Sequence, residues 1–523
     1  PRRHDIRLTE QQRSVVEHQR GPLLVLAGPG TGKTTTLVEA AAARVQAGLA
    51  AEQVLVLTFS RRAAVDLRRR IAQRLGRSVA TPRAVTFHSF CHSVVRRFGD
   101  PELYGEAVRL LTAPEQDYRV REVLAARSPN DWPPELAAAY LTRGFASEVR
   151  GALATARQLG LDADVLRAWG REYQRPAWAS LGNFLDTYLD VLEAEQVLDY
   201  AELVYRARVL LADPRIRDQV RRNAQTVLVD EYQDIDLSQA GLLRQLVPVG
   251  GDLIVMGDPD QSIDEFRGAR PRAILDFPKQ FRTVDGQPAP VVTLSTSCRL
   301  GSVLVAATRR IADRLALPRP LPEPIREGFR HLEPDPNQPP GVVEVLTYTD
   351  PAAQADQIAD LLRRAHLCDG LAWTEMAVGV RSGNLISSLT RSLLTAGVPV
   401  EVAGDEIAFG TCGAVKPLLL ALEVACHRER LDADAATQLL LSPLGGLDSI
   451  QLRRLGRALR ARHRGQAGTP RSSAELIRQA LTEPKLLAEA EPTPEVVTAA
   501  GLAQLVDRCR RAVTSGATAH QTL

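Results

Sequence analysis

Short apolar runs that alternate with polar, helix-forming stretches dominate the first half of the chain. The clearest runs are residues 23–26, 54–58, 227–229 and 253–256. Each run is followed by loop and helix signals, and this alternation predicts a parallel β-sheet with helices packed on it. Because ligand-binding loops lie at the carboxyl ends of such strands, we expect the chemistry of this segment there.

Other parts of the chain follow a different pattern. Residues 99–195 are helix-like and rich in Leu, Ala, Arg and Glu. Residues 318–341 hold eight prolines and predict a surface connection. Further on, residues 341–350 and 375–381 predict two strands of a second α/β domain, with a helix between them.

Toward its end the chain becomes helical, most clearly over residues 447–465. Asp448 is a plausible N-cap, and Leu452, Leu455 and Leu459 recur at helical spacing on one face. Arginines occupy much of the remaining surface of this helix. They are compatible with a duplex-binding surface and equally with a solvated face, so both interpretations stay open.

Charge and composition exclude some classes of protein. The formal net charge of the chain is +3, so no overall field for nucleic acid is evident. The apolar runs are too short to cross a bilayer, and the first residues, PRRHDIRLTEQQR, lack a signal-peptide core. We therefore expect a soluble, cytoplasmic protein. Only four of the 65 basic residues are lysines, and one of them, Lys33, lies in the glycine-rich segment described below.

Six cysteines are scattered along the chain without a CxxC pair. A disulfide framework is not expected in the cytoplasm, and this segment alone does not predict a zinc or iron–sulfur site. One cysteine could still join a metal cluster that residues elsewhere complete.

The glycine-rich segment is PLLVLAGPGTGKT, residues 22–34. An apolar strand, a glycine loop and a helix-compatible stretch that reaches about Val45 form the sequence context of a phosphate-binding P-loop. Glycines allow backbone N–H groups to turn toward phosphate oxygens, and the helix N-terminus adds partial positive charge. Lys33 is then expected to bridge the outer phosphates, and Thr34 to offer its hydroxyl to magnesium. Ala27 stands where the strict pattern has glycine, and a glycine turn without a ligand is the alternative.

A second strand end carries acids, because the apolar run 227–229 ends in Asp230 and Glu231. A P-loop needs a neighbouring strand that delivers an acid to the same magnesium ion, and Asp230 fits that role. Glu231 fits the base that orients or deprotonates an attacking water molecule. The alternative is a solvated helix start, where acidic side chains stabilise the first turn.

Seven segments in order resemble the successive motifs of superfamily 1A DNA helicases of the UvrD/Rep/PcrA and RecB type. The segments are LTEQQRSVV (8–16), AGPGTGKT (27–34), VLVLTFSRRAAVDLRRRI (54–71), TFHSF (86–90), VDEYQD (229–234), GDPDQSIDEFRGAR (257–270) and LSTSCRL (294–300). Within this family the chain looks most like the AdnA subunit of the actinobacterial AdnAB helicase–nuclease.

The resemblance implies an α/β fold with two RecA-like P-loop motor domains and helical insertions, 1B and part of 2B. The implied boundaries are residues 1–98 and 196–283 for motor domain 1A, 99–195 for insertion 1B, 284–408 for the first part of domain 2A, and 409–523 for an incomplete insertion 2B. Later motifs of the family are not found, so we expect a longer polypeptide, with a nuclease domain after this segment.

The resemblance also assigns residues to ATP and Mg²⁺. Gln12 matches a glutamine that reads the adenine edge. Gln261 matches a residue that senses the γ-phosphate and couples it to DNA, and Arg299 matches an arginine that approaches the γ-phosphate from the second motor domain. The implied nucleotide-binding set is Gln12, Ala27, Gly28, Pro29, Gly30, Thr31, Gly32, Lys33, Thr34 and Thr35, with Thr34 and Asp230 on the metal and Lys33, Asp230, Glu231, Gln261 and Arg299 in catalysis.

Single-stranded DNA is the implied track. The matching residues are Thr58, Phe59, Arg61, Phe87, His88, Phe266 and Arg267. Aromatic rings can stack on bases without reading their sequence, and arginines can hold phosphates. Phe59 and Phe87 could instead be core residues at strand ends, and His88 a capping or packing residue.

Two departures from the family pattern affect the adenine site. Cys298 stands where a tyrosine is common, and Thr35 stands where an arginine is common. These changes predict a thinner contact with adenine and favour the hypothesis of a weak or auxiliary motor.

The expected function is therefore that of an ATP-dependent 3′-to-5′ DNA helicase subunit. It would act at single-strand/duplex junctions or duplex ends in double-strand-break processing, with a second helicase–nuclease subunit. One alternative is a self-sufficient UvrD/PcrA-type repair helicase. Another is a DNA-binding structural subunit with a weak ATPase. The expected location is the cytoplasm, on the nucleoid.

Overall fold

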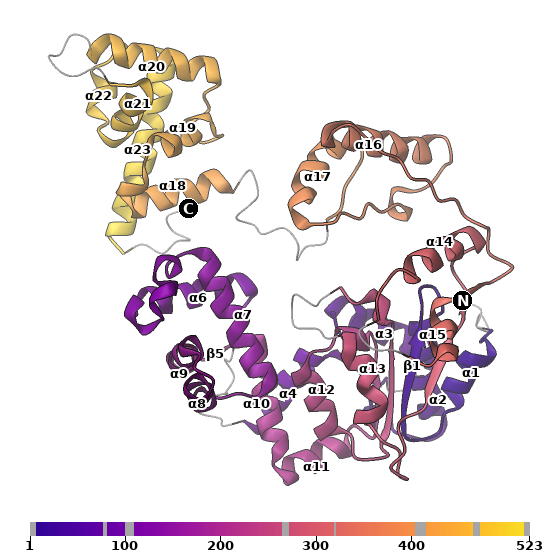
Figure 1. Ribbon diagram of the computed structural model, residues 1–523. Helices are drawn as coiled ribbons and strands as arrows, with labels where there is room; N and C mark the ends of the chain where they lie inside the picture. The colour runs from indigo at the N-terminus through magenta and orange to yellow at the C-terminus, as the bar shows by residue number, and fades with distance from the viewer. Residues whose placement is uncertain are drawn as a thin grey trace. The chain divides into compact units, whose positions relative to one another are not determined.

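The computed structural model describes residues 7–76, 81–99, 109–263, 271–317, 321–402, 415–463 and 471–516. The chain divides into two units, Pro1–Glu344 and Val345–Leu523, which are described separately (Figure 1). None of the described helices is long and apolar enough to cross a membrane.

A six-stranded parallel sheet organises the first unit. The strands lie in the order β3-β2-β6-β7-β1-β8. Their bounds are β1 Pro22–Ala27, β2 Val54–Thr58, β3 Arg83–Thr86, β6 Thr226–Val229, β7 Asp252–Gly257 and β8 Val291–Leu294. The four strands predicted from apolar runs are confirmed, whereas β3 and β8 are additional. Strand β7 separates β6 from β1, so the carboxyl ends of these three strands meet at one edge.

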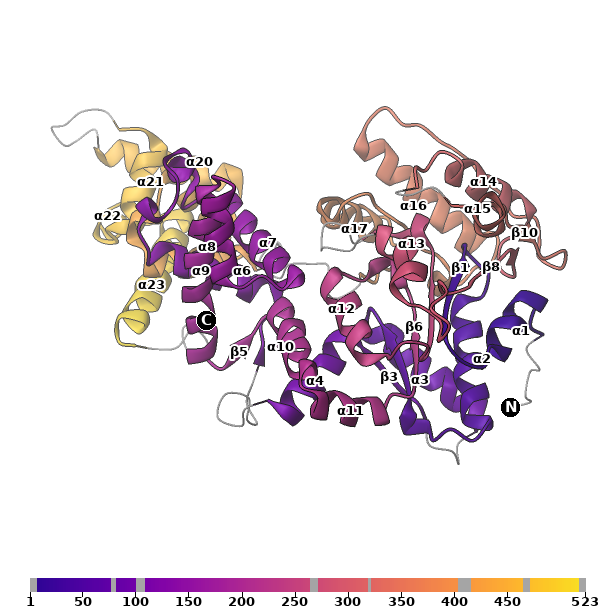
Figure 2. The same cartoon turned by 60° about the horizontal axis from the view of Figure 1, so that its bottom comes forward.

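Helices cover both faces of this sheet (Figure 2). One face packs against α1 (Glu10–Glu17), α2 (Lys33–Gln46) and α3 (Arg61–Leu75). The other packs against α4 (Phe87–Phe98), α10 (Tyr200–Ala212), α11 (Pro214–Arg222), α12 (Leu237–Leu246) and α13 (Pro271–Gln280). Burial on both faces explains why the strands are almost continuously apolar rather than alternating.

The segment 99–195, predicted to be helix-like, contains a cluster of helices in the first unit, and its assignment as an insertion stays a prediction. The cluster contains α6 (Ala113–Ala125), α7 (Arg143–Leu159), α8 (Ala163–Glu172) and α9 (Pro176–Ala194), with a two-stranded pairing of β4 (Arg109–Leu110) and β5 (Val197–Leu198). Figure 2 shows these helices side by side, and they enclose an apolar core of their own.

Residues 284–344 belong to the first unit, and their expected role as the start of a second motor domain stays a prediction. Strand β8 pairs with β1 at the edge of the sheet. The proline-rich segment 318–341 is not only a surface connection, because it contains α15 (Glu323–Arg330) and the buried Phe329. The remaining elements here are α14 (Ser302–Ala312) and the short paired strands β9 (Thr296–Ser297) and β10 (Glu333–Pro334).

At the boundary between the units and within the second unit, the structure corrects another prediction. Residues 341–350 and 375–381 form no strands, although the helix predicted between them is present as α16 (Pro351–Leu367) and is followed by α17 (Ile386–Thr395). A strand needs a neighbour to pair its backbone N–H and C=O groups, and no strand is found among the described residues of this unit. Apolar side chains of the extended segment are consequently exposed, with Val345 at 87 %.

The rest of the second unit is helical, as predicted. Its helices are α18 (Lys416–Cys426), α19 (Ala433–Leu441), α20 (Ser449–His463), α21 (Ser473–Thr482), α22 (Lys485–Ala488) and α23 (Pro494–Thr514). The Asp448 carboxylate accepts the backbone N–H groups of Ile450 and Gln451, which confirms it as a capping residue at the start of α20. Leu455 and Leu459 are buried in the apolar core of these helices, and Leu452 packs against it.

Candidate nucleotide-binding site

A glycine loop joins β1 to α2 and lies at the carboxyl edge of the sheet. The helix begins at Lys33, and its N-cap residue, Gly32, has a backbone φ of 82°. Gly30 has a φ of 78°. These left-handed conformations suit glycine, because a Cβ atom would strain them. The N-terminus of α2 therefore opens onto the loop, as phosphate binding requires.

Donors from the protein itself hold the carbonyl oxygens of this loop. The Lys33 ammonium donates to the Ala27 carbonyl over 3.0 Å, and the Thr31 hydroxyl donates to the Gly28 carbonyl over 2.8 Å. The Gln12 amide donates to the Thr31 carbonyl over 2.9 Å. Because these carbonyls are bound to protein donors, the loop can offer its N–H groups to an anion.

The segment after β8 also contacts the loop. The Ser297 hydroxyl donates to the Pro29 carbonyl over 3.2 Å, and the Cys298 backbone N–H donates to the Gly30 carbonyl over 2.9 Å. A Cβ atom built on Gly30 would lie 3.3 Å from the Cβ atom of Arg299. The Cβ atom of the exposed Arg299 thus lies beside the loop, which is compatible with the expected role of this arginine at a γ-phosphate.

Asp230 directly follows β6, which is separated from β1 and its glycine loop by β7. Burial, helped by the charge of Glu231, raises the pKa of Asp230 to about 7, and Lys33 opposes the shift. The Asp230 carboxylate accepts the backbone N–H of Glu231 over 3.1 Å. Strands β6 and β1 both pair with β7, so the acid-tipped strand end and the lysine-bearing loop lie at the same edge of the sheet.

These groups suit a magnesium ion that is bound together with phosphates. Asp230 is 5 % exposed, and no ion pair balances its charge among the residues that the structure describes. The described part of the chain contains no cluster of three His, Cys, Asp or Glu side chains that could hold a metal ion. Magnesium commonly takes one or two protein oxygens and completes its shell with water and phosphate, so Asp230 and Thr34 fit it.

Asp258 directly follows β7, the strand that lies between β6 and β1 in the sheet. The sequence patterns above do not single it out. Burial raises the pKa of Asp258 to about 6, although the Gln261 amide and Lys33 oppose the shift. Gln261 donates to the Asp258 carboxylate over 2.6 Å, so it belongs to the same edge of the sheet. An acid directly after an apolar strand was the available signal, as for Asp230.

The predicted adenine contacts are already engaged within the protein. The Gln12 side-chain oxygen accepts the Thr9 backbone N–H over 3.0 Å, while its amide bonds to the loop as described. Arg70 of α3 donates to the Thr35 hydroxyl over 2.8 Å. A guanidinium group therefore lies beside position 35, although residue 35 itself is not an arginine. The role of Gln12 in adenine recognition stays a prediction.

The predicted DNA contacts separate into buried and accessible residues. Thr58 and Phe87 are 0 % and 2 % exposed at the ends of β2 and β3. This burial supports the core interpretation of Phe87, while the predicted DNA contacts of both residues stay predictions. Phe59 is half-buried and Arg61 is exposed, so both remain accessible. Phe266 and Arg267 lie outside the described residues.

His88 lies in the first turn of α4 and contacts α10. Its ring packs edge-on against the Tyr200 ring, with centroids 4.8 Å apart. Burial and the charge of Arg61 lower the pKa of His88 to about 4, so the ring is neutral near pH 7. The structure thus supports a packing role for His88, while its predicted contact with DNA stays a prediction.

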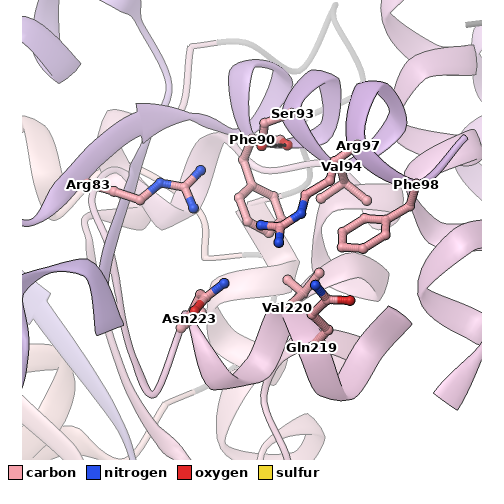
Figure 3. A pocket seen from close by; sticks show the side chains of 10 residues that line it. Arg83, Phe90, Ser93, Val94, Arg97, Phe98, Gln219, Val220 and Asn223 are labelled. Atoms are coloured by element: carbon pink, nitrogen blue, oxygen red, sulfur yellow. Dashed lines mark hydrogen bonds between the residues drawn. The ribbon is translucent and has the colours of Figure 1, made fainter. Parts of the chain in front are cut away.

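A small pocket lies at a different place, where β3 begins (Figure 3). Phe90, Val94, Phe98 and Val220 provide its apolar surface. Figure 3 shows Arg83, Ser93, Arg97, Gln219 and Asn223 around it. Because β3 starts there and the strands are parallel, the pocket belongs to the amino end of the sheet and is not part of the nucleotide site.

Comparisons with known proteins agree with this architecture. Residues 8–282 match the UvrD/REP helicase N-terminal domain. A protein of Mycobacterium tuberculosis named ATP-dependent DNA helicase UvrD2 is 31 % identical over 506 residues, covering 92 % of this chain and 67 % of that protein. The chain belongs to the UvrD/Rep helicase family.

Other members of the UvrD/Rep family match over shorter lengths. The M. tuberculosis protein named ATP-dependent DNA helicase UvrD1 is 27 % identical over 76 % of this chain and 50 % of its own length. DNA helicase II of Escherichia coli is 28 % identical over 58 % of this chain and 40 % of its own length. The chain thus spans from two fifths to two thirds of these relatives.

Proposed function

We propose that this chain is the ATP-driven motor portion of a DNA helicase that moves 3′ to 5′ along single-stranded DNA. The observation that carries the proposal is that Lys33, Asp230 and Asp258 follow the adjacent parallel strands β1, β6 and β7 and therefore lie at one edge of the sheet. That edge is where an α/β fold binds its ligand. A DNA substrate supports a location in the cytoplasm, on the nucleoid.

Each of the proposed site residues would have a separate role in ATP hydrolysis, according to the chemistry of its side chain. Magnesium, held by Asp230 and Thr34, would neutralise phosphate charge. Lys33 and Arg299 would stabilise the charge that develops on the transferred phosphoryl group. Glu231 would orient the attacking water. Phe59 and Arg61 would contact DNA without reading sequence.

The cellular role has two candidate forms. The relative that covers 92 % of this chain is named UvrD2, which favours a self-sufficient UvrD-type repair helicase. The motif resemblance to AdnA favours a subunit that processes double-strand breaks with a partner and a nuclease domain. A third form, an auxiliary motor, rests on Cys298 and Thr35. Unwinding and nuclease assays of the purified protein, with and without copurifying subunits, separate these forms.

Steady-state ATPase assays of the full-length protein test the motor assignment. Lys33→Ala should lower turnover with single-stranded DNA by roughly 100-fold, because one preorganised charge in such a site contributes about that much. Lys279→Ala is the matched control, since Lys279 is an exposed lysine on α13. Unchanged turnover in Lys33→Ala would mean that another protein supplies the activity.

A strand-displacement assay tests the direction of movement. A duplex with a 3′ single-stranded tail should be unwound in the presence of ATP, and the same duplex with a 5′ tail should not. Preference for the 5′ tail would contradict the proposed polarity while leaving the ATPase assignment intact.

A further inference from the structure

Gln233 has a buried side-chain amide that contacts Glu231, the proposed catalytic base. It lies in the short 3-10 turn Tyr232–Asp234 and is 1 % exposed. Its side-chain nitrogen donates to the Glu231 carboxylate over 2.8 Å and to the Asp234 carboxylate over 3.2 Å. Its side-chain oxygen accepts the backbone N–H of Asp258 over 3.0 Å. Gln233 therefore joins the end of β6 to the end of β7.

The orientation of this amide is fixed by its surroundings. Two carboxylates on one side accept hydrogen bonds, and a backbone N–H on the other side donates one, so a flipped amide would lose all three. A Cβ atom built on Gly257 would lie 2.5 Å from the Gln233 side-chain oxygen. That distance is too short for any larger residue at position 257, so the glycine makes room for the amide.

The contacts continue from Gln233 to the predicted γ-phosphate sensor. The Asp258 carboxylate accepts the backbone N–H of Asp260 over 3.0 Å and the Gln261 amide over 2.6 Å. A continuous line of hydrogen bonds thus runs from Glu231 through Gln233 and Asp258 to Gln261. Each group in the line is within one hydrogen bond of the next.

Glu231 needs such support because its backbone is unusual. Its φ of 52° is in the left-handed region, where residues other than glycine are uncommon. A conformation of this kind persists only where the surrounding structure holds it. The hydrogen bond from Gln233 fixes the carboxylate at the end of this strained residue.

We propose that Gln233 is a positioning residue that holds the Glu231 carboxylate toward the attacking water and links its position to Gln261. The inference rests on the proposed function. A displacement of Gln261, when phosphate or DNA engages it, then reaches Glu231 through Asp258 and Gln233. Stimulation of ATP hydrolysis by DNA depends on this link.

Hydrogen exchange tests the contact without any nucleotide. Gln233→Ala removes the acceptor of the Asp258 N–H, so this amide should exchange roughly 10-fold faster in the nucleotide-free protein. Gln239→Ala is the matched control. Gln239 is 3 % exposed, lies six residues further along, and its side-chain oxygen has no partner among the described groups. It should leave the exchange of Asp258 unchanged.

Kinetics test the link itself. With saturating single-stranded DNA, kcat of Gln233→Ala should fall by roughly 100-fold, the contribution of a well-positioned general base. The affinity for a fluorescent ATP analogue should stay within about two-fold, since no proposed phosphate contact is lost. The factor by which DNA stimulates turnover should fall as well. Gln239→Ala should keep both the wild-type kcat and the wild-type stimulation.

Gln233→Glu provides a second variant of nearly the same shape. It keeps an acceptor for Asp258 but replaces the donor to Glu231 by a repelling carboxylate, so it should bind the analogue yet lose DNA-stimulated turnover. If either variant keeps wild-type stimulation, the positioning role is overturned. Equal losses in Gln233→Ala and Gln239→Ala would also overturn it, because they would reflect core disruption. If the wild type lacks Lys33-dependent turnover, the proposed function fails and this inference fails with it.

Discussion

Asp230 is a carboxyl group that the folded protein keeps in an unfavourable place. It is almost fully buried, next to Glu231, with only partial compensation from Lys33. In the absence of a cation, burial favours the protonated form. Magnesium would reverse that preference, because a metal ligand must be deprotonated. The same residue therefore costs stability in the empty protein and provides affinity in the loaded one.

This cost predicts a dependence of stability on pH. The pKa of Asp230 is about 7 in the folded protein and near the ordinary value of about 3.9 when unfolded. Between about pH 4 and pH 7 the folded state holds a proton that the unfolded state has lost, so stability decreases as pH rises through this window. Asparagine does not titrate. Without magnesium and nucleotide, the Tm of Asp230→Asn should therefore decrease less than that of the wild type as pH rises through this window. The exposed Asp218→Asn is the control, and equal slopes in both variants would contradict the assignment.

At the scale of single residues, the sequence predicts groups that are defined by local spacing. Lys33, Asp230 and Glu231 follow from a glycine loop and from acids at a strand end, because each pattern carries its own chemistry. The sequence leaves open whether Phe87 is a core residue or a DNA contact, since its burial depends on helices that are distant in sequence. The role of Gln233 cannot be predicted from the sequence either, because it depends on where the separate strand β7 ends.

At the scale of elements, α15 is a helix that composition alone does not predict. The prolines of segment 318–341 predict a surface connection, yet Phe329 belongs to the apolar core on one face of the sheet. The next residue, Arg330, donates to the Asp260 carboxylate over 2.7 Å. The two side chains are only 7 % and 13 % exposed. This ion pair ties α15 to the turn that carries Gln261.

Removal of one partner of that buried pair should be costly. Arg330→Ala should lower the free energy of unfolding by about 3 kcal/mol, because it leaves the Asp260 charge buried and unpaired. Arg326→Ala on the same helix is the control, since its ion pair with Glu323 is exposed and should contribute less than about 1 kcal/mol. Denaturant unfolding of both variants measures the difference. Equal effects would indicate that the Arg330 pair is not an anchor.

The parallel sheet and the missing strands show the limit of local pattern. Residues 54–58 and 341–350 both read as strands, but only the first has neighbours to pair with. Periodicity reports the side chains of a segment, whereas a sheet also requires partners for its backbone. The sequence therefore predicts the first sheet well and predicts strands in the second unit that the described residues do not form.

At the scale of the whole molecule, the residues proposed for catalysis all lie in the first unit. Lys33, Asp230, Gln261 and Arg299 all precede Glu344, where that unit ends. The exposed segment 341–350 crosses this boundary without regular structure. Nucleotide binding is therefore expected to survive separation of the two units.

Limited proteolysis of the 523-residue chain tests this expectation. Chymotrypsin should cut first near Leu346 or Tyr348, because exposed segments without backbone pairing are preferred cleavage sites. Mass spectrometry identifies the N-terminal fragment, and fluorescence titration with an ATP analogue should give the affinity of the uncut chain. Early cleavage within α2 or β1, or a fragment that no longer binds, would contradict the division.

The glycine loop has a consequence for repeated turnover. Its carbonyl groups already have donors from Gln12, Thr31, Lys33, Ser297 and Cys298. A cradle of this kind keeps its shape after the products leave. A new ATP molecule can thus bind in each catalytic cycle after a rotation of the Lys33 side chain alone, without a rearrangement of the loop backbone.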